Sequence, residues 1–293
     1  MRYGPARKGT FKDYKHPHEY SEEQTLQKMK QDKIGSSLMG DHVSYSTDNG
    51  RTWSKPKSIK LPYPEGARGA GVANGSHGIQ LSNGRFVIQA RYKIGNKQKR
   101  VLFFSDKTNN LHKGRSWEHG AVISTRGITV NDDGETEEGK VNMSKQEFTI
   151  AESPKNVVMA NFRTGNKTGK GRVQVRIENA LNVSEKPEHI EALTARNAHA
   201  SLIRGSNGFD DYYLSVVAKL KEGNSKAFTR KGLYLYKSTD GAQTWQKYKV
   251  HKRSRYAGYS DMGLFSDGTI GLLYEAGRKV NYQFMIFKHL KVN

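Results

Sequence analysis

The chain has 293 residues, no cysteine and a formal net charge of +21, from 49 Lys and Arg against 28 Asp and Glu. The lack of cysteine excludes disulfides and thiolate metal sites. The sequence contains no run of about 18 apolar residues, which is the length that a transmembrane helix needs. The positive charge favours anionic partners. Because the basic residues are spread along the chain rather than gathered on one helix, the sequence predicts no specific nucleic-acid module.

The first 20 residues, "MRYGPARKGTFKDYKHPHEY", contain no apolar stretch of the kind found in a signal peptide. Either the protein is not exported by that route, or the chain lacks its natural N-terminus. Redox compartment cannot be read from a chain without cysteine.

From residue 40 onward, short apolar runs alternate with clusters of Gly, Asn, Asp and Ser, in a chain rich in Gly, Tyr and Phe. Asn83-Gly84 and Asp267-Gly268 are dipeptides typical of tight turns between strands. The runs predict an all-β protein of many short strands. Its predicted strands lie at residues 42–46, 78–92, 99–105, 147–153, 156–163, 232–238, 268–275 and 283–290.

One hairpin motif occurs more than once. "STDNGRTW" (46–53) and "STDGAQTW" (238–245) share a Ser-Thr-Asp start, a Gly-bearing turn and a Thr-Trp end, and a looser copy with an insertion spans 105–117. We expect the Asp to cap backbone N–H groups, the Gly to adopt the left-handed conformation and the Trp to fill the space under the hairpin. A repeated hairpin of this kind predicts a radial array of small sheets.

These repeats resemble the Asp-boxes of the sialidase/neuraminidase superfamily, which implies a six-bladed β-propeller. At about 40–50 residues per blade, the length is tight for six blades, which indicates a chain trimmed at its N-terminus. The resemblance assigns residues 32–293 to a propeller catalytic domain. It leaves residues 1–31 as a poorly matched segment that contributes part of the first blade plus an insertion. Residues 71–92 resemble the second-blade strand pair, whereas 173–196 depart from the pattern.

Two further motifs carry chemistry. "AGYSDMGLFSDGTIGLLYE" (257–275) resembles the last catalytic strand pair of sialidases, which implies that Tyr259 is the nucleophile and that Glu275 orients an active-site arginine. "QEFTIAESPKNVVMANFR" (146–163) resembles the motif that supplies a glutamate base, here Glu147, and the second arginine of a carboxylate-binding triad, here Arg163.

A tyrosine nucleophile suits a sialoside, because the anomeric carbon bears a carboxylate that repels an anionic attacking group. A phenol with a pKa near 10 is a poor nucleophile at neutral pH and needs a base to accept its proton. Sialidases are the tyrosine exception among glycosidases.

The remaining family positions match less well. Arg230 in "FTRKGLYLYKSTDGAQTW" is the candidate for a further triad arginine. The family's Arg-Ile-Pro motif is absent, so Arg7 is the candidate for the first arginine, and Arg2 fits no better. For the acid/base aspartate we prefer Asp32, with Asp41 as the alternative. Three guanidinium groups around one carboxylate would bind it bidentately and keep their charge.

The resemblance implies an exo-α-sialidase that acts with retention on sialylated glycans of glycoproteins, glycolipids or oligosaccharides. Transfer of the sugar to an acceptor, as in a trans-sialidase, would use the same residues. A propeller that binds sialic acid without turnover, a sialidase-like lectin, is the alternative from another class. No cofactor and no catalytic metal are predicted. The family is typically secreted or at the cell surface, and the lack of a signal peptide leaves a cytoplasmic location open.

Overall fold

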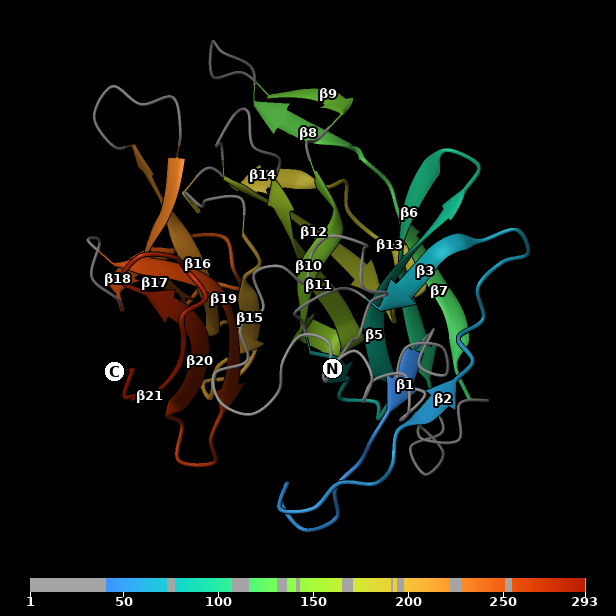
Figure 1. Ribbon diagram of the computed structural model, residues 1–293. Helices are drawn as coiled ribbons and strands as arrows, with labels where there is room; N and C mark the ends of the chain where they lie inside the picture. The colour runs from blue at the N-terminus through green and yellow to red at the C-terminus, as the bar shows by residue number, and fades with distance from the viewer. Residues whose placement is uncertain are drawn as a thin grey trace. The chain divides into compact units, whose positions relative to one another are not determined.

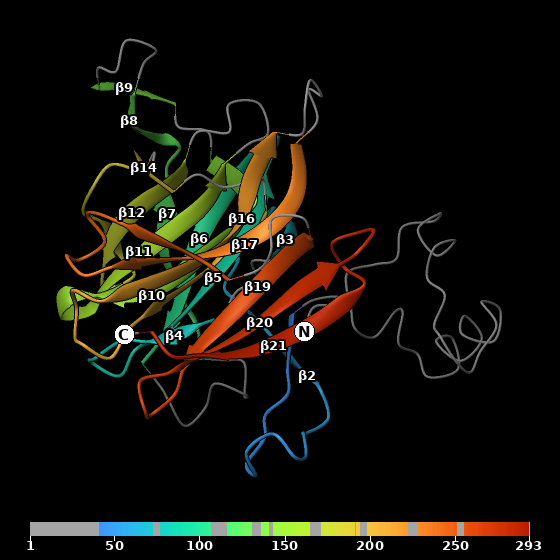
Figure 2. The same ribbon diagram turned by 90° about the vertical axis from the view of Figure 1, so that its left-hand side faces the viewer.

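The computed structural model describes residues 41–72, 77–106, 116–130, 136–140, 143–164, 171–190, 192–193, 198–221, 228–250 and 255–292. The chain divides into two compact units. The smaller comprises Met1–Leu61 and Asn109–Trp117, and the larger comprises Pro62–Thr108 and Glu118–Asn293. Figure 1 and Figure 2 show the described elements in two views. The predicted boundary between residues 31 and 32 lies outside the described residues and stays a prediction.

In the smaller unit, β1 (Asp41–Val43) and β2 (Lys57–Ile59) pair antiparallel on either side of the first repeat. Asp48 accepts hydrogen bonds from the Thr52 backbone N–H at 2.8 Å and the Thr52 hydroxyl at 2.6 Å, and Gly50 has a φ of 81°. The predicted cap and left-handed glycine are therefore confirmed. The prediction for Trp53 is wrong: its ring is 65 % exposed, and its Nε1 donates to the Gly50 carbonyl at 3.1 Å.

The larger unit begins with a five-stranded antiparallel sheet in the order β3-β5-β6-β7, with β4 paired to β5. Its strands are β3 (Arg68–Val72), β4 (Ile79–Gln80), β5 (Phe86–Ile94), β6 (Lys97–Ser105) and β7 (Glu118–Ile123). At the predicted turn between β4 and β5, Gly84 has a φ of 88°. At the start of the insertion in the third repeat, Asp106 does not cap a turn in the described residues. It accepts two hydrogen bonds from Arg85, at 2.7 and 2.8 Å.

The second sheet has the order β10-β11-β12-β14-β8-β9, with β13 paired to β12. A 3-10 helix, Pro154–Asn156, connects β10 to β11. The pairs are antiparallel except that β14 runs parallel to β8. The strands are β8 (Arg126–Val130), β9 (Thr136–Lys140), β10 (Met143–Ser153), β11 (Val157–Thr164), β12 (Arg172–Glu178), β13 (Asn182–Val183) and β14 (Glu188–Ile190).

The third sheet has the order β15-β16-β17-β19-β20-β21, with β18 paired to β17. Among the described residues, Lys231 and Tyr256 are the single pair between β17 and β19. We therefore treat the sheet as two groups, β15 to β18 and β19 to β21. The strands are β15 (Ser201–Arg204), β16 (Tyr212–Lys221), β17 (Phe228–Ser238), β18 (Gln246–Lys249), β19 (Tyr256–Leu264), β20 (Ile270–Gly277) and β21 (Phe284–Leu290).

The predicted all-β class is confirmed by these antiparallel sheets, and the described residues contain no α-helix. In that part of the chain, no helix has the length and apolar composition that crossing a membrane requires.

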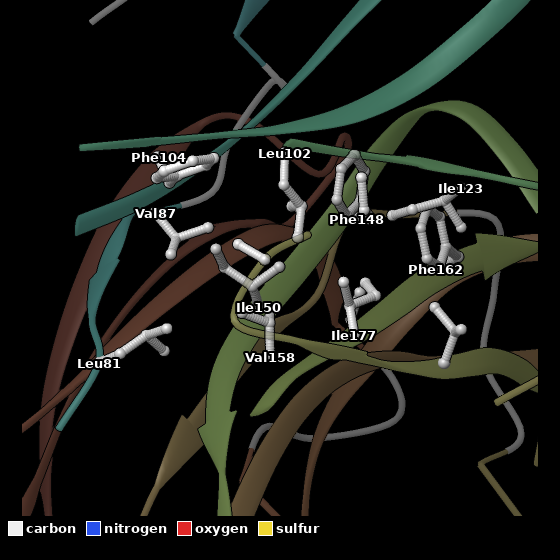
Figure 3. Packing of buried hydrophobic residues seen from close by; sticks show 14 of the residues in the cluster. Leu81, Val87, Leu102, Phe104, Ile123, Phe148, Ile150, Val158, Phe162 and Ile177 are labelled. Atoms are coloured by element: carbon white, nitrogen blue, oxygen red, sulfur yellow. The ribbon is translucent and has the colours of Figure 1, made fainter. Parts of the chain in front are cut away.

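The strand groups of the larger unit stack face to face, and each junction buries apolar side chains. Figure 3 shows the first junction, where Phe148 of β10 and Phe162 of β11 stack with ring centroids 4.5 Å apart and Leu102 of β6 lies next to Phe148. Phe104 of β6 belongs to the same cluster. A second cluster lies between the sheet of β10 to β12 and the group of β15 to β18, and a third joins that group to β19 and β20. Strands with both faces covered read as continuous apolar runs, and β5, β6, β10, β11, β17 and β20 were predicted in this way. The strands β12, β15 and β16 were not predicted.

Strand β15 contacts both β10 of the second sheet and β19 of the third. The Thr149 hydroxyl on β10 accepts a hydrogen bond from the backbone N–H of Leu202 on β15 at 3.0 Å. The Ser201 hydroxyl on β15 accepts one from the backbone N–H of Met262 on β19 at 3.0 Å. These contacts bring residues far apart in the sequence to one region.

The second repeat forms the predicted turn between β17 and β18. Asp240 accepts hydrogen bonds from the backbone N–H groups of Gln243 and Thr244, both at 3.0 Å or less, and Gly241 has a φ of 73°. Trp245 is partly buried against the second apolar cluster, as predicted. Hydrogen bonds from Thr244 lower the pKa of Asp240 to about 2.

We expect Asp240→Ala to lower the melting temperature by about 2 °C at pH 7, because the turn loses its cap. The folded-state pKa of Asp240 is depressed, so its contribution is present above the unfolded value of 3.8 and is lost as the pH falls toward 2. Thermal unfolding between pH 7 and pH 2 should therefore show the difference from wild type shrinking. A difference that stays constant down to pH 2 would contradict this account.

Candidate active site

Three of the predicted site residues meet in the larger unit. The Tyr259 hydroxyl donates a hydrogen bond to Glu147 Oε1, and Arg163 Nη1 donates to Glu147 Oε2. Arg163 Nη1 also lies 3.4 Å from the Tyr259 hydroxyl. The carboxylate of Glu147 therefore joins a phenol and a guanidinium through its two oxygens.

The strand ladders explain why these side chains converge. Phe148 on β10 pairs with Phe162 on β11, and Glu147 and Arg163 are the next residues at this end of the pairing, where the register shifts between Met143 and Phe148. The hydrogen bond between their side chains joins the two strands there. Tyr259 lies on β19, where the pairing with β20 shifts between Ala257 and Ser260. A β-bulge of this kind re-aims side chains, and it lies at the tyrosine.

The environment keeps Tyr259 a neutral phenol at pH 7. Burial raises its pKa above 10, and the hydrogen bond and negative charge of Glu147 raise it further, while the charges of Arg163 and Arg230 oppose the shift. A phenol in this state attacks only if its proton is accepted. Glu147 Oε1 is placed to accept it.

Two more side chains border the tyrosine ring. The guanidinium carbon of Arg230 on β17 lies 5.5 Å from the ring centroid, so Arg230 borders Tyr259. Its role as a triad arginine stays a prediction. The ring of His199 lies 5.7 Å away at an angle of 50° and is 1 % exposed. Burial, with the charge of Arg172, lowers the pKa of His199 to about 4, so the imidazole is neutral at pH 7. His199 is not among the predicted site residues, because no recognisable motif surrounds it.

Glu275 on β20 holds the backbone of the tyrosine. Its Oε2 accepts a hydrogen bond from the Tyr259 N–H at 3.0 Å. Gly258 makes this contact possible, because a Cβ at that position would lie 2.1 Å from Glu275 Oε2 and 2.9 Å from Asn281 Nδ2. This explains the glycine next to the tyrosine. Orientation of an arginine by Glu275 stays a prediction.

We expect Gly258→Ala to displace the Glu275 carboxylate and to destabilise the protein by about 1–3 kcal/mol, as overpacking typically does. Gly263→Ala is the matched control, because it lies on the same strand and its Cβ would meet nothing within 4 Å. Urea unfolding of both variants measures the effect. Equal free energies of unfolding for the two variants would show that the close contact between Gly258 and Glu275 does not affect stability.

The residues after Tyr259 anchor β19 to neighbouring strands. The hydroxyls of Ser260 and Ser215 on β16 lie 2.8 Å apart. Asp261 Oδ1 accepts from Ser201 at 2.9 Å and lies 2.7 Å from His77 Nδ1. Burial alone would raise the pKa of Asp261, but the hydrogen bonds from His77 and Ser201 outweigh it and lower the pKa. This network was not predicted, since its members, His77, Ser201, Ser215 and the pair Ser260–Asp261, come from four separate segments.

Four further residues were predicted for the site: Arg7, Arg2, Asp32 and Asp41. Arg7, Arg2 and Asp32 lie outside the described residues, so their roles stay predictions. Asp41, the alternative to Asp32, is the first residue of β1 in the smaller unit, opposite Ile59. Across the described ranges, no three His, Asp or Glu side chains group as ligands of a metal ion.

Known proteins resemble this chain in sequence. The model of the BNR repeat-like domain matches residues 23–272. A sialidase of Micromonospora viridifaciens is 25 % identical over 256 residues, covering 86 % of this chain and 36 % of the relative. The chain thus spans about a third of that relative's length.

Solved sialidase structures share the fold. The Hadza microbial sialidase Hz136 is 20 % identical with a TM-score of 0.59, covering 86 % of this chain and 43 % of its own. The intramolecular trans-sialidase from Ruminococcus gnavus is also 20 % identical, with a TM-score of 0.57, over 86 % of this chain and 50 % of its own. The antiparallel sheets place the chain in the all-β class, and these solved structures share its fold. The chain belongs to the BNR repeat-like domain family within the sialidase superfamily.

Proposed function

We propose that the chain is an exo-α-sialidase on a six-bladed β-propeller, acting on sialylated glycans with retention of configuration. The observation that carries this proposal is the hydrogen bond from the Tyr259 hydroxyl to Glu147, with Arg163 on the second carboxylate oxygen. A nucleophile paired with its base is the arrangement that covalent catalysis requires.

In the first step, Glu147 accepts the phenolic proton while the Tyr259 oxygen bonds to the anomeric carbon. The glycosidic bond breaks, and an aspartate, for which we propose Asp32, protonates the departing oxygen. In the second step, the same aspartate takes a proton from water, which attacks the anomeric carbon. The bond to Tyr259 then breaks, and Glu147 returns the proton to the phenolate. Two inversions give net retention.

The arginines would hold the substrate's carboxylate and fix the anomeric carbon against Tyr259. Arg163 and Arg230 are near the phenol, and we propose Arg7 as the third member. Charge-assisted bonds of this kind contribute roughly 1.5–3 kcal/mol each. Because Arg163 already binds Glu147, the substrate's carboxylate would share this guanidinium with the base.

A sialidase-like lectin is the alternative from another class. A lectin has no need of a base bonded to the tyrosine, so the contact between Glu147 and Tyr259 favours an enzyme. Transfer to an acceptor sugar would proceed through the same first step and differ only in what attacks the tyrosyl adduct.

Turnover of a fluorogenic sialoside by the full chain tests the proposal. We expect fluorophore release above the background rate, with saturation in substrate. Saturable binding of sialic acid by calorimetry without any release would identify a lectin instead. Adding lactose as acceptor and analysing products would separate hydrolysis from transfer.

A further inference from the structure

One buried cation near the site has no part in the reaction proposed above. Arg172 begins β12 and is 1 % exposed. Its Nε donates to Asn161 Oδ1, its Nη1 to the Ala198 carbonyl at 3.3 Å and its Nη2 to the Asn161 carbonyl at 3.5 Å. These acceptors are all neutral. Burying a guanidinium away from a bonded carboxylate costs free energy, so its position needs a physical reason.

The strand register supplies one. Phe148 on β10 pairs with Phe162 on β11, and Phe162 pairs with Val173 on β12. Glu147, Arg163 and Arg172 are the residues next to these three on the neighbouring strands β10, β11 and β12, where the ladder pairing ends or shifts. The three side chains form one cross-strand row of a carboxylate and two guanidinium groups. The Glu147 and Arg163 side chains are 9 % and 17 % exposed, whereas Arg172 is 1 % exposed.

The charges in this row act on one another. Burial lowers the pKa of Arg172 to about 9, attraction by Glu147 opposes the shift, and repulsion by Arg163 adds to it. Arg172 is therefore a cation at neutral pH. Because Coulomb interactions are mutual, Arg172 attracts the Glu147 carboxylate and repels the Arg163 guanidinium.

Arg172 is also bonded to the segment that carries His199. The Ala198 carbonyl that it binds precedes His199, whose ring packs against Tyr259. Asn161, its other partner, is two residues before Arg163 on β11 and so faces the same side of the sheet. The buried Arg172 side chain thus connects β11, which carries Arg163, to the segment that carries His199.

We propose that Arg172 is a positioning residue, which occupies the buried end of the row and keeps the Arg163 guanidinium against Glu147 and directed at the site. It does not touch substrate. Its effect on turnover rests on the proposed function, whereas its coupling to Glu147 does not.

A double-mutant cycle on stability tests the coupling without any substrate. Arg172→Met should lower the melting temperature of wild type by about 2 °C or more beyond its effect in the Glu147→Gln background, because the attraction is already lost there. Arg176→Met is the control, since Arg176 lies on the same strand and binds Glu185 at 2.9 Å. Its effect should be equal in both backgrounds. Additive effects of Arg172→Met and Glu147→Gln would overturn the proposal.

Kinetics with the fluorogenic sialoside tests the positioning. We expect Arg172→Met to lower kcat/KM at least about tenfold, and Arg172→Lys, which keeps the charge, to recover much of the loss. Arg176→Met should stay within about twofold of wild type. A wild type without turnover and a non-additive cycle would reject the proposed function and keep Arg172 as a positioning residue. An active wild type with unchanged kcat/KM in folded Arg172→Met would reject the positioning role alone.

Discussion

Tyr259→Phe is expected to lower sialoside hydrolysis by several orders of magnitude while leaving the protein folded. The substitution removes the oxygen that would bond to the anomeric carbon, and it keeps the ring that packs beside His199 and Arg230. Initial rates at saturating and limiting substrate would measure the loss in kcat and in kcat/KM.

Tyr256→Phe provides the matched control for the loss of a phenolic oxygen from β19. Its ring lies 5.0 Å from the ammonium group of Lys231, and it has no place in the proposed reaction. Activity near that of wild type is expected. If Tyr259→Phe lost less than tenfold, about 1.4 kcal/mol of barrier, Tyr259 would not be the nucleophile.

Glu147→Gln should reduce kcat by about 10²–10⁴-fold, the range typical of losing a general base. The amide is nearly isosteric but does not accept the phenolic proton, and the raised pKa of Tyr259 means that the phenol does not ionise unaided. The substitution also removes the counter-charge of Arg163, so a change in KM is expected together with the fall in kcat.

Glu152→Gln controls for the loss of a buried carboxylate from β10. Glu152 is 6 % exposed and binds Ser82 and Arg204 rather than site residues. It should lower thermal stability without changing kcat of the folded protein. Equal losses of kcat in the two variants would mean that Glu147 acts through the stability of the strand.

Much of the candidate site could be predicted, because its central residues lie in contiguous motifs. Glu147 and Arg163 are 16 residues apart on two strands joined by a short connection, and Tyr259 and Glu275 repeat that spacing. Local pairing of adjacent strands fixes both distances. The meeting of the two motifs depends on contacts between strand groups, and the family resemblance supplied that step.

The supporting residues could not be predicted in the same way. Arg172 and His199 carry no local signal, and their place in the site follows only from the register of three strands and from packing between sheets. For Trp53, in contrast, a clear motif led to a wrong prediction. Its motif matches that of Trp245, yet only Trp245 packs against a core cluster. The motif determines the conformation of the turn, whereas burial of its Trp depends on whether a core cluster packs against the hairpin.

The anomer released first from a sialoside tests the central claim most directly. Proton NMR during hydrolysis by the full chain distinguishes the two anomers of free sialic acid before they equilibrate. Attack by Tyr259 followed by attack of water predicts that the α-anomer appears first, and that Tyr259→Phe releases neither at a comparable rate. Initial release of the β-anomer, or release of the α-anomer at the wild-type rate by Tyr259→Phe, would contradict a tyrosyl intermediate at this site.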